Sequence, residues 1–194
     1  MATQAEALDV GGLNLGVGGK IGLNMNKASA GSTASAKYGF GWTLGAVTML
    51  DLDVAVIEFG LQYSERKHDF SDLLGSGKDA STTLKQLEIP LLGYYKLNVM
   101  EGAALRFGAG LQFEMGLGKV KGGTGNVSYS NAGIKKTGYS LLLDVGGNYK
   151  LSESGTLTAD IRYGMGLGDR KDSSGLFGEK FKTSNIELQV GYLF

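Results

Sequence analysis

Apolar and polar residues alternate along several long segments of the chain. In the segment Ala104–Gly118 the odd positions, from Leu105 to Leu117, are all apolar, and the even positions are small or polar. Because successive side chains of a strand point to opposite faces, this period of two predicts a β-strand with one apolar and one polar face. Ordinary strands have about 5 or 6 residues, whereas a tilted strand that crosses a bilayer needs about 9 to 11. The length of this segment therefore favours a membrane-spanning strand.

The same period returns in seven further segments of comparable length. We predict an all-β protein whose strands cover Leu13–Asn26, Tyr38–Ala46, Val54–Arg66, Gln86–Leu97, Ala104–Gly118, Tyr139–Tyr149, Leu157–Leu167 and Asn185–Phe194. Pro90 has no N–H to donate, so it predicts a bulge or an unpaired step in its strand.

The connections between these strands alternate in length. Short turns are expected near Leu50–Asp53, Asn98–Gly102 and Leu151–Gly155. This layout is typical of an eight-stranded antiparallel up-and-down transmembrane β-barrel, in which the short turns and both termini face the periplasm. The longer, polar loops at the other end are predicted near Lys27–Ala36, Lys67–Thr82, Lys119–Lys136 and Asp169–Thr183.

Periodicity alone does not say which face meets water, because a soluble lipocalin-like barrel also alternates, with its apolar face inside. The polar face here is mostly glycine, whereas a solvated surface is normally dense in lysine and glutamate. The apolar face also carries aromatic residues near its ends, like the girdles that lie at lipid headgroups. The soluble barrel remains the alternative. The predicted membrane-interface aromatics are Trp42, Tyr63, Tyr95, Tyr139, Tyr149, Tyr163, Tyr192 and Phe194.

With the apolar face in lipid, the polar face lines the lumen. The interior of eight strands is only just wide enough for side chains, and an isolated buried charge costs several kcal/mol. We therefore predict that these charges pair and plug the barrel, with a proton or solute path as the alternative. The predicted lumenal charges are Lys20, Glu58, Arg66, Glu88, Lys96, Arg106, Glu114, Asp144, Asp160, Arg162 and Glu187.

Composition narrows the function classes. The 194 residues carry no net charge, so nothing favours a nucleic-acid partner, and the absence of cysteine excludes disulfides and thiolate metal sites within this sequence. The small-x-small run Ala5–Ala7 resembles a signal-peptidase site. We expect residues 1–8 to be an export-signal remnant or a disordered tail, and residues 9–194 to form a single outer-membrane barrel domain. No cofactor is expected.

Five segments together resemble the PorT-like outer-membrane β-barrel family: "GGKIGLNMN" from Gly18, "IEFGLQYSERK" from Ile57, "LKQLEIPLLGYYKL" from Leu84, "RFGAGLQFEMGLG" from Arg106 and the final "VGYLF". The resemblance implies an eight-stranded barrel in the bacterial outer membrane and offers no catalytic motif. The family's namesake is linked to protein secretion, but no motif transfers that role here. We expect contacts with outer-membrane lipid, recognition of the C-terminal strand by barrel-assembly machinery, and a monomer.

Candidate chemistry is sparse. His68 has Asp69 and Ser71 nearby, but Asp69 is poorly placed to orient it, since adjacent residues of an extended chain point to opposite sides. We therefore expect His68 to be a solvated loop histidine. The acidic runs "HDFSD" and "DRKDSSG" lack the spacing of an EF-hand loop, so no metal site is predicted. Basic loop residues could contact lipopolysaccharide phosphates. They are Lys119, Lys121, Lys135, Lys136, Arg170, Lys171, Lys180 and Lys182.

These observations favour a non-enzymatic integral outer-membrane protein whose barrel anchors surface loops for envelope structure or for binding a partner or ligand. Two alternatives remain open at this point. The first is a conduit or binder for small or hydrophobic solutes. The second is a lipid-modifying barrel enzyme that would use His68.

Overall fold

The computed structural model describes residues 8–9, 14–30, 35–71, 80–122, 125–129, 134–152, 155–170 and 181–194. Within these ranges no helix is long and apolar enough to span a membrane. Three short strands are β1 (Leu8–Asp9), β7 (Val120–Gly122) and β8 (Gly125–Val127). The eight long strands are β2 (Asn14–Ala30), β3 (Ser35–Asp51), β4 (Ala55–Ser71), β5 (Ala80–Met100), β6 (Ala103–Gly116), β9 (Thr137–Ser152), β10 (Gly155–Gly166) and β11 (Phe181–Leu193).

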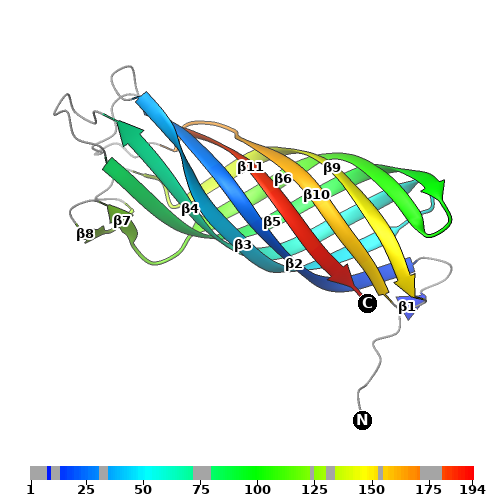
Figure 1. Cartoon of the computed structure of the whole chain (residues 1–194). Helices are drawn as coiled ribbons and strands as arrows, with labels where there is room; N and C mark the ends of the chain where they lie inside the picture. Colours follow the sequence, from blue (N-terminus) through cyan, green and yellow to red (C-terminus); the bar gives the residue numbers. More distant parts are fainter. Residues whose placement is uncertain are drawn as a thin grey trace, which may run out of the picture.

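The eight long strands form one closed antiparallel barrel (Figure 1). Each pairs with its neighbours in the chain, β4 also pairs with β5, and the first and last strands, β2 and β11, close the ring along thirteen residue pairs from Phe181↔Ala30 to Leu193↔Gly18. The predicted eight-stranded up-and-down barrel is therefore confirmed. β1 and the C-terminus lie at the same end as the β5–β6 turn, and β7 and β8 lie at the opposite end (Figure 1).

The short connections lie at the end that we call the turn end. Between β3 and β4, Asp53 adopts φ 70°, a left-handed conformation that aspartate tolerates because it can bond locally. Its N–H donates to Asp51 Oδ1 at 3.0 Å. Between β5 and β6 the corresponding residue is Gly102, with φ 76°. The turns predicted at Leu50–Asp53 and Asn98–Gly102 thus lie where expected.

The outer face of the barrel is apolar and the inner face is polar. Leu23 and Leu111 point outward and are 70% and 54% exposed, whereas Gln112, next to Leu111, points inward and is 1% exposed. A water-soluble protein rarely exposes apolar surface on this scale. The facing is the reverse of that in a lipocalin-like barrel, so the soluble alternative is wrong.

Aromatic side chains mark the two margins of the apolar face. Tyr139 and Tyr149 both point outward from β9 and are ten positions apart. At about 3.3 Å per residue they lie about 33 Å apart along the strand, which a tilt of about 40° reduces to about 25 Å, the height of the apolar band of an outer-membrane barrel. The other predicted interface aromatics, Trp42, Tyr63, Tyr95, Tyr163, Tyr192 and Phe194, are all exposed or half-exposed on the same outer face.

At the end opposite the turns, which we call the loop end, some strands extend further than others. Strands β2 to β5 have 17 to 21 residues, whereas β6, β10 and β11 have 12 to 14. Above Tyr63 the outward residues of β4 are Glu65, Lys67 and Asp69, so this part of the wall stands above the apolar band. The loops predicted over Lys27–Ala36 and Lys67–Thr82 are therefore too long, because apolar-polar alternation stops where the outer face leaves lipid.

The predicted loop Lys119–Lys136 also contains structure. Leu117 N–H donates to Lys85 O at 2.7 Å, and β7 pairs with β5 at Thr83↔Lys121. Tyr129 donates its hydroxyl to the same Lys85 O at 2.9 Å, and Ile134 N–H donates to Tyr129 O at 2.9 Å. The side chains of Val120, Tyr129 and Ile134 are buried. We call residues 117–122, 125–129 and 134–136 the strap; they pack against the loop end beside β5.

Pro90 interrupts one ladder of β5. The pairing of β4 with β5 passes from Phe59↔Leu91 to Gln62↔Glu88 without a change of register, leaving the residues opposite Pro90 and Ile89 unpaired. On its other side Pro90 stays in register with Gln112 of β6. The unpaired step predicted from this proline is confirmed, and no bulge accompanies it.

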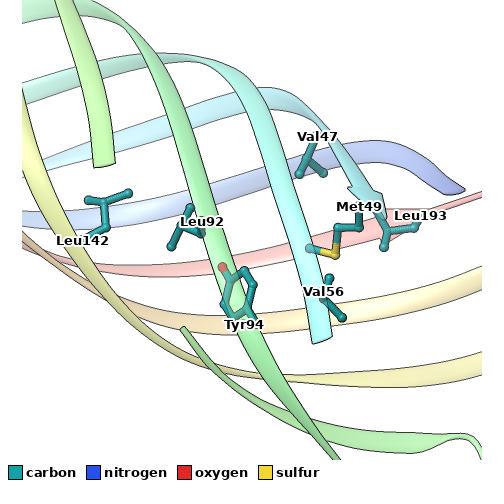
Figure 2. Close-up of a cluster of buried hydrophobic side chains, with 7 residues drawn as sticks. All are labelled: Val47, Met49, Val56, Leu92, Tyr94, Leu142 and Leu193. Carbon is teal, nitrogen blue, oxygen red and sulfur yellow. The ribbon is translucent and has the colours of Figure 1, made fainter. Parts of the chain in front are cut away.

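An apolar cluster also fills part of the lumen. Figure 2 shows its side chains pointing into the space that the strands enclose. Inside the barrel these residues exclude water next to the charged side chains, so the plug is mixed rather than wholly polar. The cluster consists of Val47, Met49, Val56, Leu92, Tyr94, Leu142 and Leu193.

Candidate functional site

Six charged side chains meet in the lumen and form what we call the central cluster. They come from β2, β4, β6, β9 and β10, and none is more than 3% exposed. Three are cations and three are anions, so the cluster is neutral as a whole. Its members are Lys20, Glu58, Arg106, Asp144, Asp160 and Arg162.

Except for Arg162 with Asp144, which lie on the neighbouring strands β10 and β9, the ion pairs of the central cluster join strands that are not neighbours. Glu58 lies 2.7 Å from Lys20 Nζ through Oε2 and 2.8 Å from Arg162 Nη2 through Oε1. Arg162 Nε also donates to Asp144 Oδ2 at 2.7 Å. Asp160 lies 2.8 Å from Lys20 Nζ and accepts from Arg106 Nη2 at 2.5 Å. Each buried charge therefore has an opposite charge beside it, which offsets the cost of its desolvation.

Tyr94 connects the central cluster to the apolar cluster. Its hydroxyl accepts from Arg162 Nη2 at 3.3 Å and donates to Glu58 Oε2 at 3.3 Å. The guanidinium of Arg106 lies 4.9 Å from the Tyr94 ring centroid, a cation–π contact. The ring lies against Gly108, where a Cβ would overlap it. Glycine on the inner face thus makes room for a large neighbour.

A second group, the loop-end cluster, lies nearer the strap. Glu114 Oε2 accepts from Arg170 Nη1 at 2.7 Å, and Glu114 Oε1 lies 3.6 Å from Arg66 Nη1. Arg66 Nε lies 2.9 Å from Glu88, which also accepts from the Ser64 hydroxyl. Ser140 and Gln112 donate to Glu114 at 2.6 and 3.2 Å. Two arginines from distant parts of the chain are thus held by two carboxylates.

Two predicted lumenal charges take part in none of the ion pairs given above for these clusters. Lys96 lies at the turn end, where its Nζ pairs with both oxygens of Asp51 at 2.6 and 2.7 Å, and it is only half-buried. Glu187 is buried on β11, in register with Arg162. The other nine predicted lumenal charges lie within the two clusters.

Two predictions about loop residues are wrong. His68 is not a solvated loop residue, because β4 continues to Ser71 and turns this side chain inward, where it is 1% exposed. Arg170 is not a surface cation; it is 5% exposed and completes the loop-end cluster. No periodic signal marks Arg170, since Gly168 with φ 95° breaks the alternation just before it.

The lumenal side chains are packed too closely for a water-filled path. A pore would leave the inward residues accessible to water, but those of both clusters are at most 5% exposed. Within the described residues no group of three or more His, Asp or Glu side chains could hold a metal ion. His68 lies inside the wall, where it does not face lipid. The ion pairs and hydrogen bonds of this arrangement connect strands of the barrel across the lumen.

Comparisons with known proteins identify a family with this barrel architecture. Residues 3–172 match the model of a family described as outer membrane protein beta-barrel domain. The chain belongs to this family. It is an integral protein of the bacterial outer membrane. The finer assignment to PorT-like members stays a prediction.

Two solved structures share the fold of this outer membrane barrel. Neisserial surface protein A superimposes with a TM-score of 0.57 at 16% identity, covering 91% of this chain and 95% of that one. The outer membrane protein OprG from Pseudomonas aeruginosa has a TM-score of 0.58 at 16% identity, covering 93% and 95%. No curated protein matches the chain.

The outer-membrane location indicates which end of the barrel faces the periplasm and which faces the outside of the cell. Short turns face the periplasm and longer loops face outward, so the strap and the tall part of the wall lie outside the cell. Lysines surround this outer end just above the apolar band, and the described outward acidic residues there are Glu65, Asp69 and Asp169. We call the lysines the lysine belt: Lys27, Lys37, Lys67, Lys85, Lys119, Lys121, Lys135, Lys136 and Lys182. Of the basic residues predicted to face lipopolysaccharide, Lys171 and Lys180 lie outside the described residues.

Proposed function

We propose that this outer membrane barrel is a closed, non-enzymatic anchor that presents the tall wall of β2 to β5 and the strap at the cell surface, for envelope structure or for binding a partner. The observation that carries the proposal is the packed lumen. Its charges are neutralised by one another and hidden from water, which favours an anchor over the alternative of a conduit through the barrel.

The internal ion pairs support a scaffold role. The central cluster joins β2 and β10 to β4, and β6 to β10, across the lumen. Charge-assisted bonds between distant strands resist changes in the cross-section of the barrel. A rigid base suits a protein whose exposed part is an extension of its own wall.

Ion currents across a planar bilayer test whether the barrel is closed. Purified protein is reconstituted in a planar bilayer beside a porin as positive control, and we expect no current steps above those of the protein-free bilayer. A triple variant, Glu58→Ala, Tyr94→Ala and Arg162→Ala, empties the middle of the lumen and serves as the matched open form, provided that it keeps the faster gel mobility of an unboiled barrel. Steady ion currents through the unaltered protein would contradict the proposal.

A second candidate function rests on the lysine belt. Lipopolysaccharide occupies the outer leaflet and carries phosphates where the belt lies, and lysine is a common phosphate ligand. Nine described lysines against three described outward carboxylates give this end a positive potential at the headgroup level. We expect the belt to hold lipopolysaccharide phosphates.

This candidate is tested with vesicles that contain lipid A, phosphorylated or enzymatically dephosphorylated. The variant Lys119→Gln, Lys121→Gln, Lys135→Gln, Lys136→Gln should lose the preference for phosphorylated lipid A. The control carries arginine at the same four positions, which keeps the positive charges and should keep the preference. Equal binding of both lipids by the unaltered protein would rule the function out. We further expect a monomer whose strand β11 is recognised by barrel-assembly machinery.

A further inference from the structure

A groove interrupts the outer wall of the barrel near the turn end. It has a volume of about 460 Å³ and is lined mainly by outward apolar residues of β6, β9, β10 and β11. One row of residues in register crosses these four strands: Leu105, Gly147, Ala159 and Val190. The two central residues of the row are glycine and alanine, and the larger Tyr149 and Leu157 flank them. The groove exists because side chains are missing from the middle of the row.

A polar hollow adjoins the groove at the rim of the barrel. It measures about 490 Å³ and shares five lining residues with the groove, from Val99 and Met100 to Asn148. Both volumes lie within the range of about 300 to 1,000 Å³ that holds small molecules. The lining of the hollow includes Asp51, Lys96, Glu101 and Lys150, which are two anions and two cations. The two spaces together are apolar at one end and charged at the other.

Two of the four charges are occupied and two are available. Lys96 is bound to Asp51 by two short bonds. Within the described part of the chain, Lys150 and Glu101 take part in no ion pair, and both are exposed. Both line the hollow, and the backbone of Lys150 lies close to that of Glu101, because Lys150 N–H donates at 2.7 Å to the carbonyl of Gly102, the next residue in the chain. One positive and one negative side chain thus line the hollow that adjoins the groove.

The depth of the two spaces fits the periplasmic leaflet. Tyr149, one wall of the groove, is the lower aromatic of β9 and marks the headgroup level at the turn end. The groove therefore faces hydrocarbon and the hollow faces headgroups. Glycerophospholipids make up this leaflet, and the opposite charges of Lys150 and Glu101 in the lining of the hollow complement a headgroup that carries a phosphate and an ammonium.

We propose that the groove and the hollow bind one zwitterionic glycerophospholipid of the phosphatidylethanolamine class, with an acyl chain lying over Gly147 and Ala159, the phosphate at Lys150 and the ammonium at Glu101. The groove is on the outer wall and the hollow is at the turn-end rim, and neither contains a residue of the two lumenal clusters or of the lysine belt. The proposed site does not depend on whether the lumen conducts or whether the belt binds lipopolysaccharide.

The experiment is native mass spectrometry of the detergent-solubilised full chain with added phosphatidylethanolamine, compared with phosphatidylglycerol of the same chains. We expect one retained phosphatidylethanolamine per barrel. The variant Gly147→Leu fills the groove and should lose that lipid. A Cβ at Gly147 meets only Ala104 O at 3.6 Å and Leu105 Cδ2 at 3.9 Å, so the wall accommodates the change.

The matched control is Gly93→Leu, an outward glycine of β5 that has open space for a Cβ and does not line the groove. It should keep the lipid. The single variants Glu101→Lys and Lys150→Glu should each weaken the retention of phosphatidylethanolamine. If Gly147→Leu fails to show the gel mobility of a folded barrel, Ala159→Leu takes its place. Equal retention by Gly147→Leu and Gly93→Leu would mean that only bulk lipid covers the wall. Equal retention of both headgroups would overturn the charge assignment, and a dimer that Gly147→Leu abolishes would assign the groove to a second copy.

Discussion

Arg162 of β10 reaches across the lumen to Glu58 of β4, with Nη2 2.8 Å from Oε1. The two residues are 104 positions apart in the chain, and their strands are not neighbours in the barrel. Backbone ladders fix each strand to the next, but only contacts of this kind fix opposite walls to each other. The stability of the barrel therefore depends on its interior charges as well as on its hydrogen-bonded ring.

Removal of the Arg162 side chain should destabilise the barrel strongly. Arg162→Ala leaves Asp144 without its 2.7 Å partner and takes from Glu58 its 2.8 Å partner, leaving it Lys20 and a longer 3.9 Å contact with Arg106, and breaking a buried pair costs about 3 to 5 kcal/mol. Urea unfolding in lipid vesicles, followed by the fluorescence of the single tryptophan, Trp42, measures the change. Lys27→Ala on the exposed belt should unfold like the unaltered protein, and an equal midpoint for Arg162→Ala would refute the role assigned to the cluster.

A charge placed on the outer wall should cost more near the middle of the band than at its margin. Leu111 faces lipid halfway along the apolar positions of β6, and Leu111→Arg should lower the free energy of unfolding by about 2 to 4 kcal/mol. Leu97→Arg, at the turn-end margin, should cost about 0 to 1 kcal/mol. The same unfolding assay compares them. If both variants lost the same stability, the depth assigned to Leu111 would be incorrect.

Arg170 should hold the strap against the loop end. Besides its ion pair with Glu114, its carbonyl accepts from Lys135 N–H at 2.6 Å. Arg170→Ala leaves a buried carboxylate less well satisfied, which costs about 1 to 3 kcal/mol. We expect faster amide hydrogen exchange at Ile134 to Lys136 while the exchange of β9 below Leu141 stays slow. The exposed Lys136→Ala is the control, and unchanged exchange in Arg170→Ala would show that the strap is held by other contacts.

The docking of the strap should weaken at high pH. Burial raises the pKa of Tyr129 from 10.0 to about 12, because the charged phenolate is disfavoured there. The neutral phenol stabilises the docked strap below pH 10, and this contribution is lost as the pH rises toward 12. A difference spectrum at the tyrosinate band between the unaltered protein and Tyr129→Phe isolates this group among nine tyrosines. A Tyr129 titration centred near pH 10 would contradict a docked strap.

His68 should have no part in lipid chemistry. It lies inside the wall at the height of the strap, paired in register with Thr82 and hidden from lipid. We expect His68→Ala to leave the membrane lipid composition unchanged when lipid extracts of producing cells are compared by mass spectrometry. The control is a strain that lacks the protein. A lipid species that requires the protein and disappears in His68→Ala would revive the enzymatic alternative.

The alternation of residues such as Leu111 and Gln112 predicted the strands, their facing and the closed barrel, because lipid outside and a packed lumen inside impose opposite polarity on neighbours. It failed above Tyr63, where Glu65 and Lys67 meet water while Arg66 and His68 remain inside. Where both faces of a strand carry polar residues, the sequence no longer alternates between apolar and polar, although the strand continues. For that reason the sequence pattern did not predict the upper part of β2 to β5.

The partners of the lumenal charges could not be predicted either. Which residues meet depends on the register of strands far apart in sequence, as for Lys20 with Asp160 or Arg66 with Glu114. Arg170 was missed because the residues before it leave the strand. The groove depends on Gly147 and Ala159 lying side by side on two strands, and only the paired register brings these small residues together.

The pairing of β2 with β11 also constrains the order of assembly. The last seam of hydrogen bonds joins Gly18 to Leu193, so it cannot form until nearly the whole chain has been made and delivered. Until then the sheet has two open edges and an apolar face without lipid, a form prone to aggregation. Contacts between residues this distant in sequence also form slowly. Ring closure is therefore a late event that converts an aggregation-prone sheet into a barrel without open edges.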